Sequence, residues 1–289
     1  MAADIDHAKI VERLMDSHDG RIYAILQQLE ERIAELVLSA PLQDGNLFDL
    51  AWSIQARADI EQIMRETFLS EGDSIVREYD RIVASMDEML STYGAFTGVQ
   101  QETIDQLKRV AFSGFQDIAS TYVDDLANEL YQNTLTGRPI NDSIKTMRQR
   151  INGVYIASDQ AEVERLVELA NGGDEEAVKE LHRKYSADRT GRNMRKYATQ
   201  MVHDTTMQFD ASINIAAGKE IGATKWKYYG SVIRDSREFC QEHAGQIMTE
   251  EYIRDTWANR DWQGKAEGDP FIVRGGYNCR HHFRPVIED

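Results

Sequence analysis

Both cysteines of the chain and three of its seven histidines lie in two short, separated stretches. Residues three apart share a face within one helical turn, so Cys240 and His243 can converge on one point. Residues two apart share a face of an extended segment, so Cys279 and His281 can do the same while His282 points away. Two such pairs make four ligands, the tetrahedral complement of a structural zinc ion. The spacing therefore predicts a closed zinc site with no position for catalytic water.

Two other interpretations of these residues stay open at the level of sequence. In the first, the thiols are reduced and buried, and the histidines are hydrogen-bonded to neighbouring acids or backbone. In the second, Cys240 and Cys279 form a disulfide. The first pair has one thiol where a double Cys-x-x-Cys motif has two, which makes its spacing less specific for zinc.

The remaining candidates for chemistry are weaker. His203 and Asp204 are adjacent on a predicted helix and so face different directions, and His18 borders an apolar stripe. We expect these side chains to be solvated or packed. The sequence has no phosphate-binding Gly-x-x-x-x-Gly-Lys, no dinucleotide fingerprint, no Gly-x-Ser-x-Gly and no His-Glu-x-x-His. We therefore expect a protein without catalytic residues or an organic cofactor.

The elements that must position the two stretches begin with a long helical region. Apolar residues recur every three or four positions over most of the first 186 residues, and two prolines interrupt them. The segment 75–96 alternates steps of four and three, which is a heptad seam expected to form core or oligomer contacts. The helices that the pattern predicts cover 11–37, 50–72, 75–96, a long stretch after 98, 141–153, 158–170, 174–185 and 186–222.

The pattern changes after residue 222. Alternation of apolar and polar residues predicts three short strands, and Thr249 is a good N-cap for a helix between them. The predicted strands cover 224–230, 245–248 and 280–287.

The expected fold is therefore mainly α. A long helical-bundle or coiled-coil-like N-terminal region is followed by a small α+β C-terminal domain. We place the two regions at 1–186 and 187–289, with the compact α+β unit starting near residue 223.

Composition separates these regions further. The chain has 289 residues, 33 basic and 49 acidic side chains and a net charge of −16. Residues 1–186 have 18 basic and 34 acidic side chains, whereas 187–289 have 15 of each. Acidic surfaces repel phosphate backbones, so we expect no specific nucleic-acid binding. Mean hydropathy is −0.53 and no apolar run approaches the length of a membrane span, so we expect a soluble protein with no membrane partner and no secretory signal.

An ordered series of short motifs runs through the C-terminal third. The motifs are Trp226-Lys227-Tyr228, Asp235-Ser236-Arg237-Glu238-Phe239-Cys240 with Gly245 following, Pro270-Phe271-Ile272, Gly275-Gly276-Tyr277-Asn278-Cys279-Arg280-His281 and Arg284-Pro285-Val286. Over roughly residues 190–289 this series resembles the Mu F-like phage head morphogenesis family of minor capsid proteins. The preceding helix departs from the family, because His203-Asp204-Thr205-Thr206 stands where many relatives carry an Arg-Thr-Glu-like segment.

The resemblance carries over particular positions. The family's aspartate and arginine before the first cysteine correspond to Asp235 and Arg237, and the glycine that follows this motif corresponds to Gly245. Its Asn-Cys-Arg-Cys/His closing motif falls on Asn278, Cys279, Arg280 and His281. Its earlier pair, a cysteine followed by a cysteine or histidine, falls on Cys240 and His243.

The resemblance also implies a function. Family members are low-copy virion proteins that associate with the portal vertex inside the head, and some take part in genome delivery. We therefore expect a minor capsid protein whose partners are the portal protein and other head proteins. It would be present as a homo-oligomer or in several copies per virion, located inside the head and, during assembly, in the host cytoplasm.

Two alternatives from other classes remain. One is a metal-dependent hydrolase or toxin-like enzyme in which His243 and neighbouring acids activate water. The other is a cytoplasmic coiled-coil adaptor unrelated to any virion.

Overall fold

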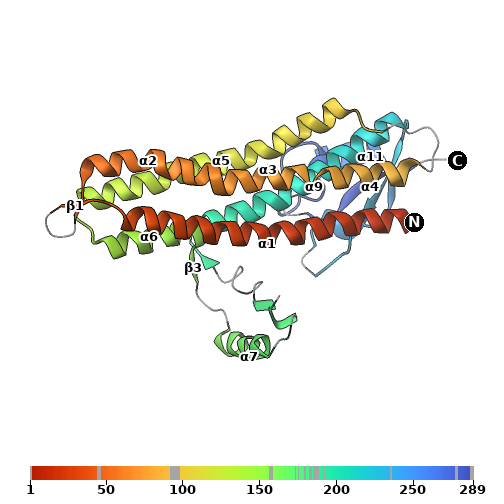
Figure 1. The fold of residues 1–289 in the computed structure, drawn as a ribbon. Helices are drawn as coiled ribbons and strands as arrows, with labels where there is room; N and C mark the ends of the chain where they lie inside the picture. Colours follow the sequence, from red (N-terminus) through yellow and green to blue (C-terminus); the bar gives the residue numbers. More distant parts are fainter. Residues whose placement is uncertain are drawn as a thin grey trace. The chain divides into compact units, whose positions relative to one another are not determined.

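The computed structural model is mostly helical, with a small antiparallel sheet near the C-terminus (Figure 1). This confirms the prediction of a mainly α protein with a small α+β C-terminal part. The structure describes residues 2–43, 47–91, 98–155, 159–172, 174, 176–178, 180–181, 184, 189–191, 193–234, 236–276 and 279–286.

Long helices account for most of the described chain. The helices are α1 (Ala2–Leu38), α2 (Leu50–Met64), the π-helix η1 (Arg65–Leu69), α3 (Ser70–Arg77), α4 (Asp80–Ser91), α5 (Gln101–Leu135), α6 (Ile140–Asn152), α7 (Gln160–Asn171), α9 (Met194–Glu220), α10 (Glu238–His243), α11 (Glu250–Asn259) and α12 (Pro270–Val273). No helix in the described part of the chain combines the length and apolar character that a bilayer span requires.

The chain forms two compact units, each assembled from separated stretches. Unit 1 comprises 1–20, 72–115 and 200–289, and unit 2 comprises 21–71 and 116–199. This division does not follow the sequence boundary at residue 186. Helices α1, α3, α5 and α9 each contribute residues to both units, which composition along the chain does not reveal.

The heptad seam is part of the interior of unit 1. Ile75, Tyr79, Ile82 and Met86 are fully buried and Met89 nearly so, whereas Tyr93 and Phe96 lie outside the described residues. The Tyr79 ring packs 4.8 Å from that of Phe209 on α9, centroid to centroid. The seam therefore makes core contacts within one chain, which is one of the two roles expected for it.

Gly72 of unit 1 does not end a helix, although the sequence pattern predicts a helix end there. Gly72 lies within α3, and a Cβ added to it would overlap the ring of Phe115 on α5. The missing side chain gives the aromatic ring room to approach the helix backbone. The helix is interrupted instead at Glu78 and Tyr79, between α3 and α4.

The C-terminal sheet of unit 1 has the order β6-β5-β7, with both pairs antiparallel. β5 (Lys225–Tyr229) pairs Trp226 with Met248 of β6 (Ile247–Thr249) and with Pro285 of β7 (His282–Val286). The three predicted strands are thus present. Thr249 caps α11 as expected, because its side chain accepts a hydrogen bond from the backbone N–H of Tyr252.

Unit 2 is built from the remaining parts of the divided helices, together with α2, η1, α6 and α7. Its charged side chains form ion pairs such as Arg32–Glu66 (2.6 Å) and Arg148–Glu30 (3.2 Å). Two short ladders complete it, β1 (Leu42–Gln43) with β2 (Leu47–Phe48) and β3 (Val154–Tyr155) with β4 (Arg189–Thr190).

Candidate metal centre

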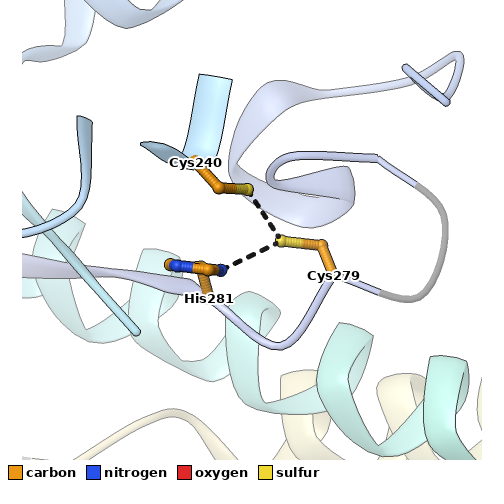
Figure 2. Close-up of side chains that lie close together, drawn as sticks. All are labelled: Cys240, Cys279 and His281. Atoms are coloured by element: carbon orange, nitrogen blue, oxygen red, sulfur yellow. Dashed lines mark hydrogen bonds between the residues drawn. The ribbon is translucent and has the colours of Figure 1, made fainter. Parts of the chain in front are cut away.

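Three of the four residues expected to bind zinc meet in unit 1. Figure 2 shows Cys240 on α10, with Cys279 and His281 on the segment that leads into β7. The two Sγ atoms lie 3.6 Å apart across 39 residues of sequence, and the Cys279 Sγ lies 3.7 Å from Nδ1 of His281. The three donor atoms lie within 4.8 Å of one another. The side chains are 2%, 3% and 5% exposed, so the cluster is closed to solvent.

Strand β5 brings these segments together. Its Tyr228 lies opposite Phe283 of β7, which aligns the residues just before β7 with the end of β5. On the other edge, the backbone N–H of Gly245 donates to the carbonyl of Tyr228 (2.7 Å), and the Tyr228 N–H donates to the carbonyl of Gln246 (2.9 Å). These bonds hold the end of α10 beside the strand. The Tyr228 hydroxyl consequently lies 3.4 Å from Sγ of Cys240 and 3.5 Å from Sγ of Cys279.

Aromatic side chains surround the cluster and exclude water from it. The ring of Phe239 packs edge-on against Tyr228 (5.4 Å) and Trp257 (5.7 Å). Trp262 stacks on Phe239 and donates its indole N–H to the carbonyl of Gly275 (2.9 Å). In such an apolar setting, polar donor atoms are stable only when they are paired.

Two glycines allow the close approach. A Cβ at Gly275 would overlap Sγ of Cys240 and would lie 3.1 Å from Sγ of Cys279. A Cβ at Gly230 would overlap the ring of His281. The same ring stacks on Tyr228, at 5.2 Å between centroids and 14° between planes. The imidazole is therefore held by contact with a bare backbone and with an aromatic ring.

The electrostatics of the cluster favour one thiol and one thiolate. The hydrogen bond between the two sulfurs lowers the pKa of Cys279 and raises the pKa of Cys240, and burial adds to the rise at Cys240. Hydrogen bonds with His281 and Tyr228 and the charge of Arg274 also favour the Cys279 thiolate. Burial raises the pKa of Tyr228 well above its ordinary value, so the phenol is neutral.

His243, the fourth expected ligand, lies outside this group. Its Nδ1 donates to the carbonyl of Phe239 (2.8 Å), and its Nε2 lies 3.4 Å from the hydroxyl of Tyr252. The ring stacks on Phe239 at 4.4 Å. Both ring nitrogens are thus turned toward other partners, although His243 and Cys240 share one helix.

The residues expected to support the motif have separate roles where the structure describes them. The Nε of Arg237 donates to the carbonyl of Gly264 (3.1 Å), which joins two loops of the unit. Gly245 adopts φ 84°, a left-handed conformation at the end of α10 that favours glycine. Arg280 is exposed. Asp235 and Asn278 lie outside the described residues.

Tyr228 and Arg274 are the site residues that sequence reasoning missed. Arg274 is 2% exposed, has φ 56°, and donates from Nε to the carbonyl of Cys279 (3.2 Å). The one sequence signal for Arg274 was that it directly precedes the pair Gly275-Gly276. Tyr228 belongs to an alternating strand, where a tyrosine indicates an ordinary core residue.

The chemistry open to this cluster is metal binding. Two sulfurs and an imidazole nitrogen are donors for a borderline-soft metal ion.

A pocket of about 510 Å³ lies elsewhere, in unit 2, and Glu30, Lys145 and Arg148 are among its lining residues. Its lining contains no cysteine or histidine, so the cluster and this pocket are separate features.

Comparisons with known proteins identify no relative. No family model matches the chain, and neither does any curated protein or solved structure.

Proposed function

We propose that this chain is a minor structural protein of a tailed-phage head, associated with the portal vertex, which acts in head morphogenesis and genome delivery without catalysing a reaction. The portal protein and other head proteins are its partners. The chain occupies the inside of the head in several copies, and it is present in the host cytoplasm while particles assemble.

The convergence of the motif residues carries this proposal. Trp226, Cys240, Phe271 and Cys279 come from four separate motifs of the resemblance, and all four belong to one buried apolar cluster. The Trp226 and Phe271 rings pack edge-on at 4.9 Å. Motifs that are scattered in sequence but joined in one core are typical of a structural domain.

Burial supports a role without catalysis. A nucleophile or a metal-bound water must be accessible to a substrate. None of Cys240, Cys279 and His281 is more than 5% exposed. The hydrolase alternative uses His243, which is 2% exposed and engaged by Phe239 and Tyr252.

The charge distribution is compatible with confinement beside packaged DNA. Residues 1–186 have 16 more acidic than basic side chains. Phosphate backbones bind proteins chiefly through lysine and arginine, so an acidic surface releases DNA easily. A protein at the portal with this charge would not impede the passage of the genome.

Deletion of the gene from its phage or prophage genome tests the proposal. Nuclease-treated, density-purified particles from the intact genome should contain the chain at a small fraction of the coat protein's copy number, as measured by quantitative mass spectrometry. Particles from the deletion should be reduced in number or in infectivity, and the chain supplied in trans should restore them. Absence of the chain from purified particles would refute the proposed location.

A variant separates the structural role from the enzymatic alternative. The variant His243→Gln is checked for folding by its thermal melt and supplied in trans to the deletion. If the role is structural, it should restore infectivity. The same folded variant should fail to do so if His243 activates water.

A further inference from the structure

Four donor atoms, not three, converge in the buried cluster of unit 1. Besides the two sulfurs and Nδ1 of His281, the Tyr228 hydroxyl oxygen lies 3.4 Å and 3.5 Å from the two Sγ atoms. The sulfurs are 3.6 Å apart, and the Cys279 Sγ is 3.7 Å from the imidazole nitrogen. These four separations are alike, and the ligand atoms of the two cysteines and the histidine all lie within 4.8 Å of one another, a grouping that one metal ion can bridge.

These separations match the dimensions of a zinc site. Zinc lies about 2.3 Å from sulfur, about 2.0–2.1 Å from nitrogen and about 2.0–2.2 Å from oxygen. In a tetrahedron with those bond lengths, taking the carboxylate value for oxygen, the corners are about 3.8 Å apart for two sulfurs and about 3.6 Å apart for sulfur and nitrogen or for sulfur and oxygen. The observed distances agree with these values to within about 0.2 Å.

We infer that Cys240, Cys279 and His281 bind one zinc ion, and that the hydroxyl oxygen of Tyr228 occupies the fourth position. This assignment replaces the sequence-predicted His243 by an oxygen ligand from β5. It does not depend on the proposed role in a phage head.

The donor set favours zinc over the other common metal ions. Calcium and magnesium prefer oxygen ligands, of which this site offers one. Metal binding would displace the proton of Cys240, and the resulting two thiolates and an imidazole suit zinc or copper(I). The oxygen at the fourth corner favours zinc, which accepts oxygen, nitrogen and sulfur in one tetrahedral site.

The surroundings of the cluster are built to hold these atoms in place. Gly275 presents bare backbone to the two sulfurs, and its absent Cβ would lie 3.2 Å from the Tyr228 oxygen. Stacking on Tyr228 and contact with Gly230 fix the His281 ring. The site is closed, because its three cysteine and histidine ligands are almost fully buried and Tyr228 is fully buried. A closed site with four protein ligands is structural.

Metal analysis of the full chain tests the stoichiometry. The protein is purified under reducing conditions, and its zinc is measured by elemental mass spectrometry and by release to a chromophoric chelator. We expect one zinc per chain. Protein that contains no zinc and binds none when it is titrated would overturn the inference, as would a purified Cys240–Cys279 disulfide that excludes metal.

Cobalt(II) substitution tests the ligand set on the unaltered chain, so this measurement does not depend on whether variants fold. The cobalt protein should show the intense visible bands of a tetrahedral site and the near-ultraviolet charge-transfer intensity of two thiolates. Weak octahedral bands, or the intensity of one thiolate, would contradict the ligand set.

Matched histidine variants separate the two candidate nitrogen ligands. His281→Gln should lower zinc affinity at least 100-fold in competition with the chelator. His243→Gln, a buried histidine on the same unit, should leave affinity within threefold of the unaltered chain. The reverse result would show that His243 is the ligand. Circular dichroism and thermal melts identify folded variants, and only those enter the comparison.

The role of Tyr228 has its own readout. Tyr228→Phe removes the oxygen and should open a position that exogenous thiocyanate can occupy, with a shift in the cobalt spectrum. The unaltered cobalt protein should show no such shift. If the unaltered protein responds to thiocyanate, its fourth position is exchangeable, and Tyr228 is not the ligand.

Discussion

The Nε2 atom of His7 and the Oδ1 atom of Asp210 lie 2.7 Å apart in the interior of unit 1, although 203 residues separate them. The other ring nitrogen of His7 lies 2.9 Å from the hydroxyl of Ser85 on α4. These three residue types form catalytic triads in other proteins, but His7 and Asp210 are fully buried here. The contact therefore fastens α1, α4 and α9 of unit 1 to one another, and its burial leaves no access for a substrate.

Acid should destabilise the protein through this region. Burial alone would raise the pKa of Asp210, but the hydrogen bond with His7 and the electrostatic effect of nearby basic side chains hold it well below its usual range. Burial lowers the pKa of His282 to about 3. Both groups bind protons more readily in the unfolded chain, so the free energy of unfolding should fall as pH drops below about 6.5 and continue falling toward pH 3.

Urea unfolding of metal-free protein at intervals between pH 7.5 and 4 measures this dependence. Asp210→Asn should lower stability by about 1.5–3 kcal/mol at pH 7, because it replaces a buried carboxylate that is hydrogen-bonded to His7. A stability that stays constant from pH 7.5 to pH 4 would contradict the assigned pKa directions.

The heptad seam gives a second prediction. Met86 is fully buried, so Met86→Ala should lower the free energy of unfolding by about 2–5 kcal/mol. Because the seam packs within the chain, the loss should be the same over a hundredfold range of protein concentration. Ile54→Ala on α2, at a side chain that is 63% exposed, is the control and should change stability by less than about 0.5 kcal/mol. A melting temperature that rises with concentration only in the unaltered chain would place the seam between chains.

Periodicity predicted most of the helices because it records which face of a helix is buried. It placed a helix end at Gly72 because glycine is a weak helix former, whereas the space left for the Phe115 ring depends on packing against α5. The two units were not predictable either. They depend on contacts such as His7 with Asp210, which no local pattern encodes.

The candidate site was predictable in part for a similar reason. Residue type and spacing identified Cys240, Cys279 and His281, which the structure brings together. The same helical spacing suggested His243, but its Nδ1 bonds to the carbonyl of Phe239 four residues earlier. Tyr228 approaches the sulfurs only through the pairing of β5 with β7 and the position of α10, and neither is written in local sequence.

Glycine substitutions give a third prediction. Gly275→Ala should destabilise unit 1 and disrupt the cluster, because the new methyl group would overlap the Cys240 sulfur. Gly20→Ala is the matched control, since no atom lies within 4 Å of a Cβ there and the residue is exposed within α1. The control should raise stability by about 0.5–1 kcal/mol through a less flexible unfolded chain. Chemical denaturation measures the free energy of unfolding of both variants, and an equal change in the two would contradict the close packing at Gly275.

Thiol reactivity gives a fourth prediction. Cys240 and Cys279 are free and buried, so Ellman's reagent should modify them at least about 100-fold more slowly in native protein than in guanidinium, because reaction requires local opening. Ile233→Cys adds a thiol at a position that is 66% exposed and should react at once in the same sample. Rapid modification of both native thiols in metal-free protein would show that the cluster is open.

The discontinuous make-up of unit 1 has a consequence for biosynthesis. Its segments 1–20, 72–115 and 200–289 leave the ribosome at widely different times, and β7 is completed only when residue 286 has been added. The first turns of α1 must wait for α9, so His7 stays without its aspartate during most of translation. Pairings between such distant segments are slow to form and leave apolar surface uncovered meanwhile. Unit 1 therefore cannot complete its core before the last strand of its sheet has left the ribosome.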